Sequence, residues 1–163
     1  MARLFDGPET QRILAFLESI GVAVAAERLG EDTFIPAMTI RRGVLIVDPA
    51  RLEHPGDLLH EAGHLAVTDP QRRADLDSVG DDPGEEMAAI AWSWAALVEI
   101  GLAPEILFHE AGYLGASRNF IVNFTSGRTL GVPMLASFGM TAEPHRAAQE
   151  GLAPYPAMTR WLR

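Results

Sequence analysis

Apolar positions near the start of the chain predict a helix followed by a strand. Between Pro8 and Ile20 the apolar residues recur three or four positions apart, which gives a helix one hydrophobic face, and Gly21 follows as a natural end. The short apolar run 22–24 then predicts a β-strand.

Two further apolar runs predict a hairpin. Residues 37–40 and 44–47 flank the sequence Arg41-Arg42-Gly43, in which Gly43 can adopt the positive φ that a tight turn needs. Together with the strand at 22–24, they predict a small three-stranded, largely antiparallel sheet.

Two longer segments predict buried helices. Pro55 suits the first turn of a helix whose apolar positions continue to the Asp-Pro pair at 69–70. Residues 85–100 are rich in Ala, Trp and Leu, contain no Gly or Pro, and are followed by Gly101, which predicts a well-buried helix. The polar, acidic stretch 71–84 between them predicts a loop or a frayed helix.

The rest of the chain carries weaker signals. Short helices are predicted at 117–125 and 133–138, and the apolar tail 154–161 is expected to dock on the domain. The whole pattern predicts a single domain over residues 1–163 of the α+β class. It is mostly helical, with the small sheet beside the helix that starts near Pro55.

Composition and charge narrow the classes of function. The 163 residues are 48% hydrophobic and 21% charged, as in soluble globular domains, and 22 Asp+Glu against 13 Lys+Arg give a formal charge of −9. That charge repels phosphate groups, so we expect no direct nucleic-acid partner. No apolar stretch reaches the ~20 residues of a membrane span, and no signal-peptide core follows the start. We therefore expect a cytoplasmic protein without a membrane partner; the oligomeric state stays open.

The strongest chemical signal is the sequence His60-Glu61-Ala62-Gly63-His64. Residues four apart share one face of a helix, so the two imidazoles can bind one metal ion, and Glu61 beside them can take a proton from water. The chain has no cysteine, so imidazole and carboxylate must supply every strong ligand. We expect Zn²⁺ bound by His60, His64 and one further residue.

Two neighbouring carboxylates compete for the place of the third ligand. Glu85 and Glu86 open the apolar helix, where a buried carboxylate needs a partner or a metal, although both could simply favour the positive end of that helix. The segment 75–86 also matches a calcium-binding EF-hand loop at positions one, three, six and twelve. Val79 stands at position five in place of an oxygen donor, so a solvated loop is favoured.

These residues give the chain a resemblance to the ImmA/IrrE-type zinc metallopeptidases, which are small gluzincin-like enzymes with a zincin-like fold. The resemblance covers about two thirds of the chain and rests on the first helix, the hairpin, the HExxH helix and a second helix that carries Glu86, Ala89, Trp92 and Ser93. It implies zinc ligation by His60, His64 and Glu86, with Glu61 as general base. The sequence after Trp92 departs from the family's usual continuation.

Two residues after the second helix are candidates for stabilising the oxyanion of the reaction. His109 and Tyr113 can both donate hydrogen bonds, and the chain could fold back there over the metal site. The alternative is that they are a surface histidine and a half-buried core tyrosine. We interpret His54 and His145 as ordinary surface residues.

The sequence as a whole predicts a zinc-dependent peptidase with a polypeptide substrate. The resemblance points to a bacterial regulatory protein as one candidate, and the sheet edge could hold an extended peptide by strand addition. One alternative is a proteolytically silent zinc-binding regulatory or interaction module, and another is a hydrolase of small molecules. A tail (154–161) lying across the metal cleft would indicate a latent or inactive protein, whereas an open cleft favours the enzyme.

Overall fold

The sheet is small and mixed, with β2 at one edge. The computed structural model describes residues 5–30 and 37–163, so the start of the chain, where no signal-peptide core is expected, lies partly outside it. The strands are β1 (Val24–Ala26), β2 (Met38–Arg41) and β3 (Val44–Val47), in the order β1-β3-β2.

The pairing of these strands places β2 at one edge of the sheet. β2 and β3 form the predicted antiparallel hairpin, whereas β1 pairs in parallel with β3, with Val24 opposite Leu45. The sheet is thus half parallel, where the sequence pattern predicts a largely antiparallel one. The difference arises because β1 pairs with the second strand of the hairpin and not with the first.

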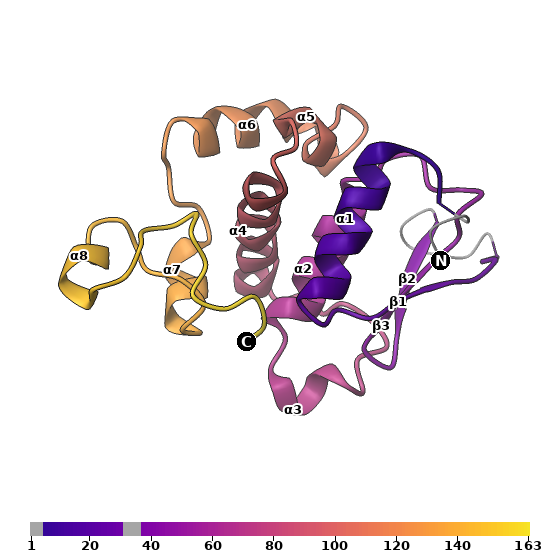
Figure 1. Cartoon of the computed structure of the whole chain (residues 1–163), viewed down its shortest axis with the longest axis horizontal. Coiled ribbons are helices and arrows are strands. Elements are labelled where there is room, and N and C mark those ends of the chain that lie inside the picture. The colour runs from indigo at the N-terminus through magenta and orange to yellow at the C-terminus, as the bar shows by residue number, and fades with distance from the viewer. Residues whose placement is uncertain (1–4, 31–36) are drawn as a thin grey trace.

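Three helices carry most of the core and confirm the predicted α+β architecture. They are α1 (Pro8–Ser19), α2 (Asp57–Val67) and α4 (Pro83–Ile100), and α2 and α4 make the most extensive contact of any pair of elements. α4 runs through the middle of the molecule, with the sheet on the far side of α1 and α2 (Figure 1). Its central residues are almost completely buried.

The start of α4 shows why the predicted boundary at residue 85 is too late. Asp82 is the N-cap, and its carboxylate accepts hydrogen bonds from the amides of Gly84 and Glu85 at 2.7 and 3.1 Å. Pro83 takes the first helical position, where its missing N–H costs nothing. At the other end, Gly101 adopts a φ of 74° and ends the helix as predicted.

Shorter helices surround α4. The segment 71–84, predicted as a loop or a frayed helix, contains most of α3 (Pro70–Arg73). Beyond α4 come α5 (Pro104–Leu107), α6 (Ser117–Thr125), α7 (Val132–Ser137) and α8 (Ala147–Glu150). The predicted helix at 117–125 is confirmed, and the one predicted at 133–138 lies one residue earlier. α5 and α6 lie across one end of α4, and α7 and α8 lie along its side away from the sheet (Figure 1).

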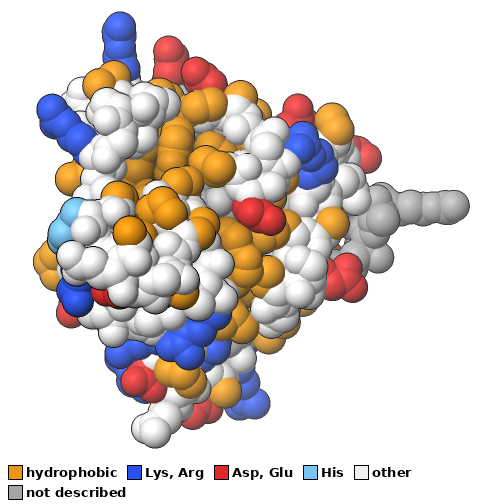
Figure 2. Space-filling view, turned by 60° about the vertical axis from the view of Figure 1, so that its left-hand side comes forward, with side chains coloured by type: hydrophobic (Ala, Val, Ile, Leu, Met, Phe, Trp, Pro, Cys, Tyr) orange, Lys and Arg blue, Asp and Glu red, His pale blue; other side chains and the backbone are white. Residues whose placement is uncertain are grey.

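The apolar tail docks on the helical core, as predicted. The Trp92 indole N–H donates to the Trp161 carbonyl at 2.9 Å, and the Tyr155 hydroxyl donates to the Ala91 carbonyl at 2.8 Å. The side of the molecule that carries α7 and α8 nevertheless shows several groups of apolar side chains between charged ones (Figure 2). Among the described helices, none has both the length and the apolar character needed to cross a membrane.

Candidate metal centre

The two histidines of the HExxH sequence lie on α2 with their rings facing one another. Their Nε2 atoms are 3.1 Å apart, the rings are nearly perpendicular, and both side chains are largely buried. This is the geometry expected for residues one helical turn apart on the same face. The predicted pairing of His60 with His64 is therefore present.

Glu86 from α4 completes the group. Its carboxylate oxygens lie 3.5 Å from His60 Nε2 and 3.1 Å from His64 Nε2. Two ligand atoms bound to the same tetrahedral zinc ion are roughly 3.3 Å apart, because each is about 2.0–2.1 Å from the metal. The three side chains therefore fit the spacing that a zinc ion requires.

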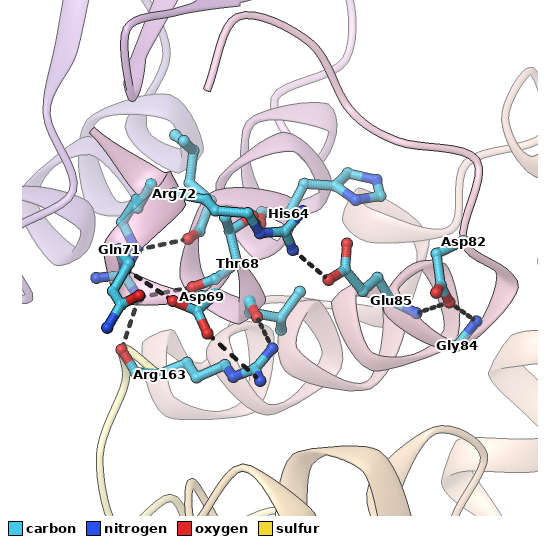
Figure 3. A network of polar contacts seen from close by, with 12 residues as sticks. His64, Thr68, Asp69, Gln71, Arg72, Asp82, Gly84, Glu85 and Arg163 are labelled. Atoms are coloured by element: carbon cyan, nitrogen blue, oxygen red, sulfur yellow. Dashed lines mark hydrogen bonds and ion pairs between the residues drawn. The ribbon is translucent and has the colours of Figure 1, made fainter. Parts of the chain in front are cut away.

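The neighbouring Glu85 points elsewhere. It pairs with Arg72 at 3.0 Å, and Figure 3 shows its carboxylate directed toward Arg72, next to the Asp82 cap. Adjacent residues of α4 thus have different partners, because Glu85 forms a surface ion pair and Glu86 faces the histidines. Of the two carboxylates that the sequence leaves open, the structure brings Glu86 to the histidines.

The protonation states also suit a cation. Burial, and then the proximity of His64, lower the pKa of His60, so its imidazole is neutral near pH 7. The hydrogen bond with His64 is the main cause that lowers the pKa of Glu86, so that carboxylate is charged. Metal ligands must be neutral imidazole and ionised carboxylate, and His60 and Glu86 meet these two conditions.

A seam of small residues lets α2 and α4 approach closely at this point. Gly63 lies between the two histidines, and a Cβ atom there would be only 2.8 Å from the Ala89 carbonyl oxygen. The Ser93 hydroxyl donates to that same carbonyl at 2.6 Å and lies 3.2 Å from the Leu59 carbonyl. The distance between the helices, and with it the position of Glu86, thus depends on a residue without a side chain.

Glu61 is buried beside the group. One of its carboxylate oxygens and the ring nitrogens of His60 and His64 lie within 4.8 Å of one another, a looser spacing than the contacts to Glu86. Burial raises the pKa of Glu61 to about 7. A carboxylate with a pKa near the working pH is suited to accept and return a proton.

His109 lies next to the metal centre through a contact with α2. Its Nε2 is 2.7 Å from Asp57 Oδ1, and its ring stacks on His54 with the centroids 3.7 Å apart. The interpretation of His54 as an ordinary surface residue is therefore wrong. His54 and Asp57 are three residues apart in the turn that starts α2, a spacing that could have suggested a shared partner. His145 is exposed, as predicted.

Tyr113 packs against His60 of the candidate metal centre. Its ring meets the His60 ring edge-on, with the centroids 5.4 Å apart, and its hydroxyl is buried without a hydrogen-bond partner among the described residues. Burial, and then the nearby carboxylates, raise the pKa of this hydroxyl, so it stays protonated. The chain does fold back toward the site at Tyr113, as the sequence pattern suggests.

A hollow of about 630 Å³ opens on one side of this centre, here called the β2 hollow. His60, Glu61, His64 and Glu86 line it together with residues 38–40 of β2 and residues 77–83. No residue of the tail lines it. The edge strand and the candidate metal-binding residues therefore share one hollow that no residue of the tail lines.

The acidic segment that resembles an EF-hand loop does not gather its carboxylates. Asp77 accepts a hydrogen bond from the Arg42 amide, Asp82 caps α4, and Glu85 pairs with Arg72. Asp77, Asp82 and Glu85 thus have separate partners, and among the described residues the group that could hold a metal ion is His60, Glu61 and His64 rather than this segment. The structure therefore gives the calcium interpretation no support.

Comparisons with known proteins add no relative. No protein-family model, no curated protein and no solved structure matches this chain. The resemblance to ImmA/IrrE-type peptidases therefore stays a prediction from the residues, and the arguments about function rest on the geometry of the site.

Proposed function

We propose that this protein is a zinc-dependent peptidase. The observation that carries the proposal is the convergence of two imidazole nitrogens and one carboxylate from two helices, with a buried glutamate alongside. His60, His64 and Glu86 would hold the ion. Three protein ligands leave a position for water, as in catalytic rather than structural zinc sites. A cytoplasmic location is part of the proposal and is compatible with the absence of cysteine.

The chemistry divides between the ion and the protein. When bound, zinc polarises a carbonyl group and makes water acidic enough to act as a nucleophile near neutral pH. Glu61 accepts the proton of the attacking water and delivers it to the amine nitrogen as the peptide C–N bond breaks, so one water is consumed per bond cut. The raised pKa of Glu61 supports both transfers, because a carboxyl group with a pKa near 7 can both accept and release a proton at neutral pH.

The edge strand supports a polypeptide as the substrate. Residues 38–40 of β2 line the β2 hollow together with Glu61 and both histidines. An extended peptide can add to such an edge through main-chain hydrogen bonds, which places its carbonyl groups beside the metal centre without a deep pocket. The uncovered hollow also favours an enzyme over a silent zinc-binding module.

Metal analysis of three proteins tests the ligand set. We expect about one zinc per chain in the wild type, measured by elemental mass spectrometry, and in the Glu85→Gln control, whereas Glu86→Gln loses most of it. Equal zinc in all three would exclude Glu86 as a ligand. No zinc in the wild type, even after reconstitution, would leave His60 and His64 as structural residues.

A second variant tests catalysis separately from binding. Glu61→Gln is expected to keep its zinc and to lose hydrolysis of a random peptide mixture by at least about 100-fold, as expected for loss of general acid–base catalysis. Retained hydrolysis in this variant would refute the mechanism. A zinc-loaded wild type that cuts no peptide in the mixture would favour the silent module.

A further inference from the structure

A second hollow, of about 750 Å³, lies next to the same metal centre. We call it the α6 hollow, because its wall includes Phe120 of α6. His60 and Glu86 line both hollows, so the candidate metal ligands stand between them. A volume of this size is in the range of pockets that enclose drug-sized ligands, so the largest natural side chain fits inside.

The walls of the α6 hollow are mainly apolar. They include Leu52, Met87, Ile90, Leu114 and Phe120. Ile90 is almost completely buried, whereas Leu114 is fully exposed at the surface. An apolar wall that runs from the core to an exposed leucine provides a continuous surface for an apolar group.

The charged groups near the metal centre are already paired. The Asp57 carboxylate lies 2.7 Å from His109 Nε2, and Glu86 faces His60 and His64. Neither of these two carboxylates is left to attract a basic side chain into the inner part of the hollow, and the third carboxylate of the lining, Glu53, is exposed to solvent. The ligand that this part of the surface favours is therefore apolar rather than cationic.

Leu114 has an unusual setting. It and the preceding Tyr113 have φ values of 52° and 55°, a conformation that is uncommon for residues with a branched or bulky side chain. This turn presents Leu114 to solvent while Tyr113 packs against His60. The chain thus joins an exposed apolar side chain directly to a residue of the metal centre.

We propose that the α6 hollow is a specificity pocket that takes a bulky aliphatic or aromatic side chain of the substrate next to the bond that is cut, and that Leu114 forms its outer rim. This inference rests on the proposed peptidase function and names its substrate class. A peptide that lies along β2 passes Glu61 and the metal ligands, and its next side chains reach the α6 hollow because His60 and Glu86 border both spaces.

The first test is the sequence preference of cleavage. The zinc-loaded wild type is incubated with a synthetic mixture of random dodecapeptides, and mass spectrometry identifies the bonds that are cut. We expect Leu, Ile, Met or Phe over Ala by about tenfold or more at one position flanking the bond, since each methylene in an apolar pocket contributes about tenfold. Cleavage with no such preference would overturn the specificity pocket while leaving the peptidase function in place.

The second test changes the rim. Leu114→Asn keeps the size of the side chain and tolerates a positive φ better than leucine does. We expect it to lower kcat/KM about fivefold for peptides with a bulky apolar residue at that position, and to change little for those with alanine. The control is Val122→Thr, an exposed residue of α6 outside the hollow, which should leave both values unchanged. Equal losses for both peptide classes would contradict a role in specificity.

The third test does not depend on turnover. N-acetyl-phenylalanine amide and N-acetyl-alanine amide are titrated into the Glu61→Gln protein, and binding is followed by NMR. The phenylalanine amide should bind at least about tenfold more tightly, and Leu114→Asn should reduce that difference. Equal binding of the two amides would overturn the specificity pocket, whether or not any peptide is cut. A failure to cut any peptide would by itself refute the proposed peptidase function.

Discussion

The small residue between the two histidines gives the sharpest prediction from this structure. In Gly63→Ala the new methyl group would lie 2.8 Å from the Ala89 carbonyl oxygen and 3.1 Å from Ser93 Oγ. Ordinary contact begins at 3.4 Å, so α4 must move away by about 0.6 Å. Because Glu86 lies on α4, less than one turn before Ala89, it would move away from the histidines as well.

The expected effects on stability and on metal binding differ in size. Overpacking costs about 1–3 kcal/mol, and alanine recovers about 1 kcal/mol of helix propensity, so the net loss in the metal-free protein is about 0–2 kcal/mol. Ligand distances in zinc sites tolerate only about 0.2 Å, so a shift of this size should weaken zinc binding by about 10–100-fold. The variant should therefore fold but bind zinc poorly.

Two measurements separate these effects. Competition with a chromophoric chelator gives the zinc affinity, and guanidinium unfolding of the metal-free protein gives the stability. Gly30→Ala is the control, because its new Cβ atom would have no heavy atom of the described residues within 4 Å. Wild-type zinc affinity in Gly63→Ala would show that the separation of α2 and α4 does not position Glu86.

Three other substitutions test how the structure around the site is held. Burial raises the pKa of Glu61 to about 7, so the metal-free wild type loses stability as pH rises from about 4.5 through 7 and this side chain ionises. In unfolding experiments above pH 8, Glu61→Gln should be more stable than the wild type by up to about 3 kcal/mol. Below pH 4 this difference in stability should vanish. A difference in stability between the two proteins that does not change with pH would contradict a raised pKa of Glu61. Gly56→Ala would place a Cβ atom 1.9 Å from the Ile106 carbonyl oxygen, so we expect a loss of about 3 kcal/mol in guanidinium unfolding, and an unchanged midpoint would refute this contact. Tyr155→Phe removes the hydrogen bond to Ala91 and should cost about 1 kcal/mol by calorimetry; no change in Tm would show that this bond does not hold the tail.

The elements near the metal centre were readily predictable from the sequence because their signals are local. The spacing of His60 and His64 defines a helix face, and Gly101 ends α4 where a left-handed residue is needed. The Asp82 cap and the proline after it are equally local signals of a helix start. They lie in a polar, acidic segment, whose composition predicts a loop instead. The hairpin follows from its turn, whereas the partner of β1 depends on a crossover that no local pattern encodes.

The parts of the site that the sequence could not supply depend on distant contacts. Glu85 and Glu86 are adjacent, and only the packing of α4 on α2 decides which of them faces the histidines. The stacking of His54 on His109 joins segments more than fifty residues apart. The sequence shows Gly63 as a glycine inside a predicted helix. Only the structure shows that the close approach of α4 requires a residue without a side chain there.

The shortness of β2 has a consequence for self-association and for product release. An exposed strand edge can recruit a second copy of its own chain, yet β2 offers only four residues, and it ends at Arg41, which pairs with Glu27 at 2.9 Å. So few main-chain bonds give two copies little to gain by pairing edge to edge. For the same reason a peptide cut in the proposed reaction would be held at this edge by only a few bonds, and its fragments would leave quickly.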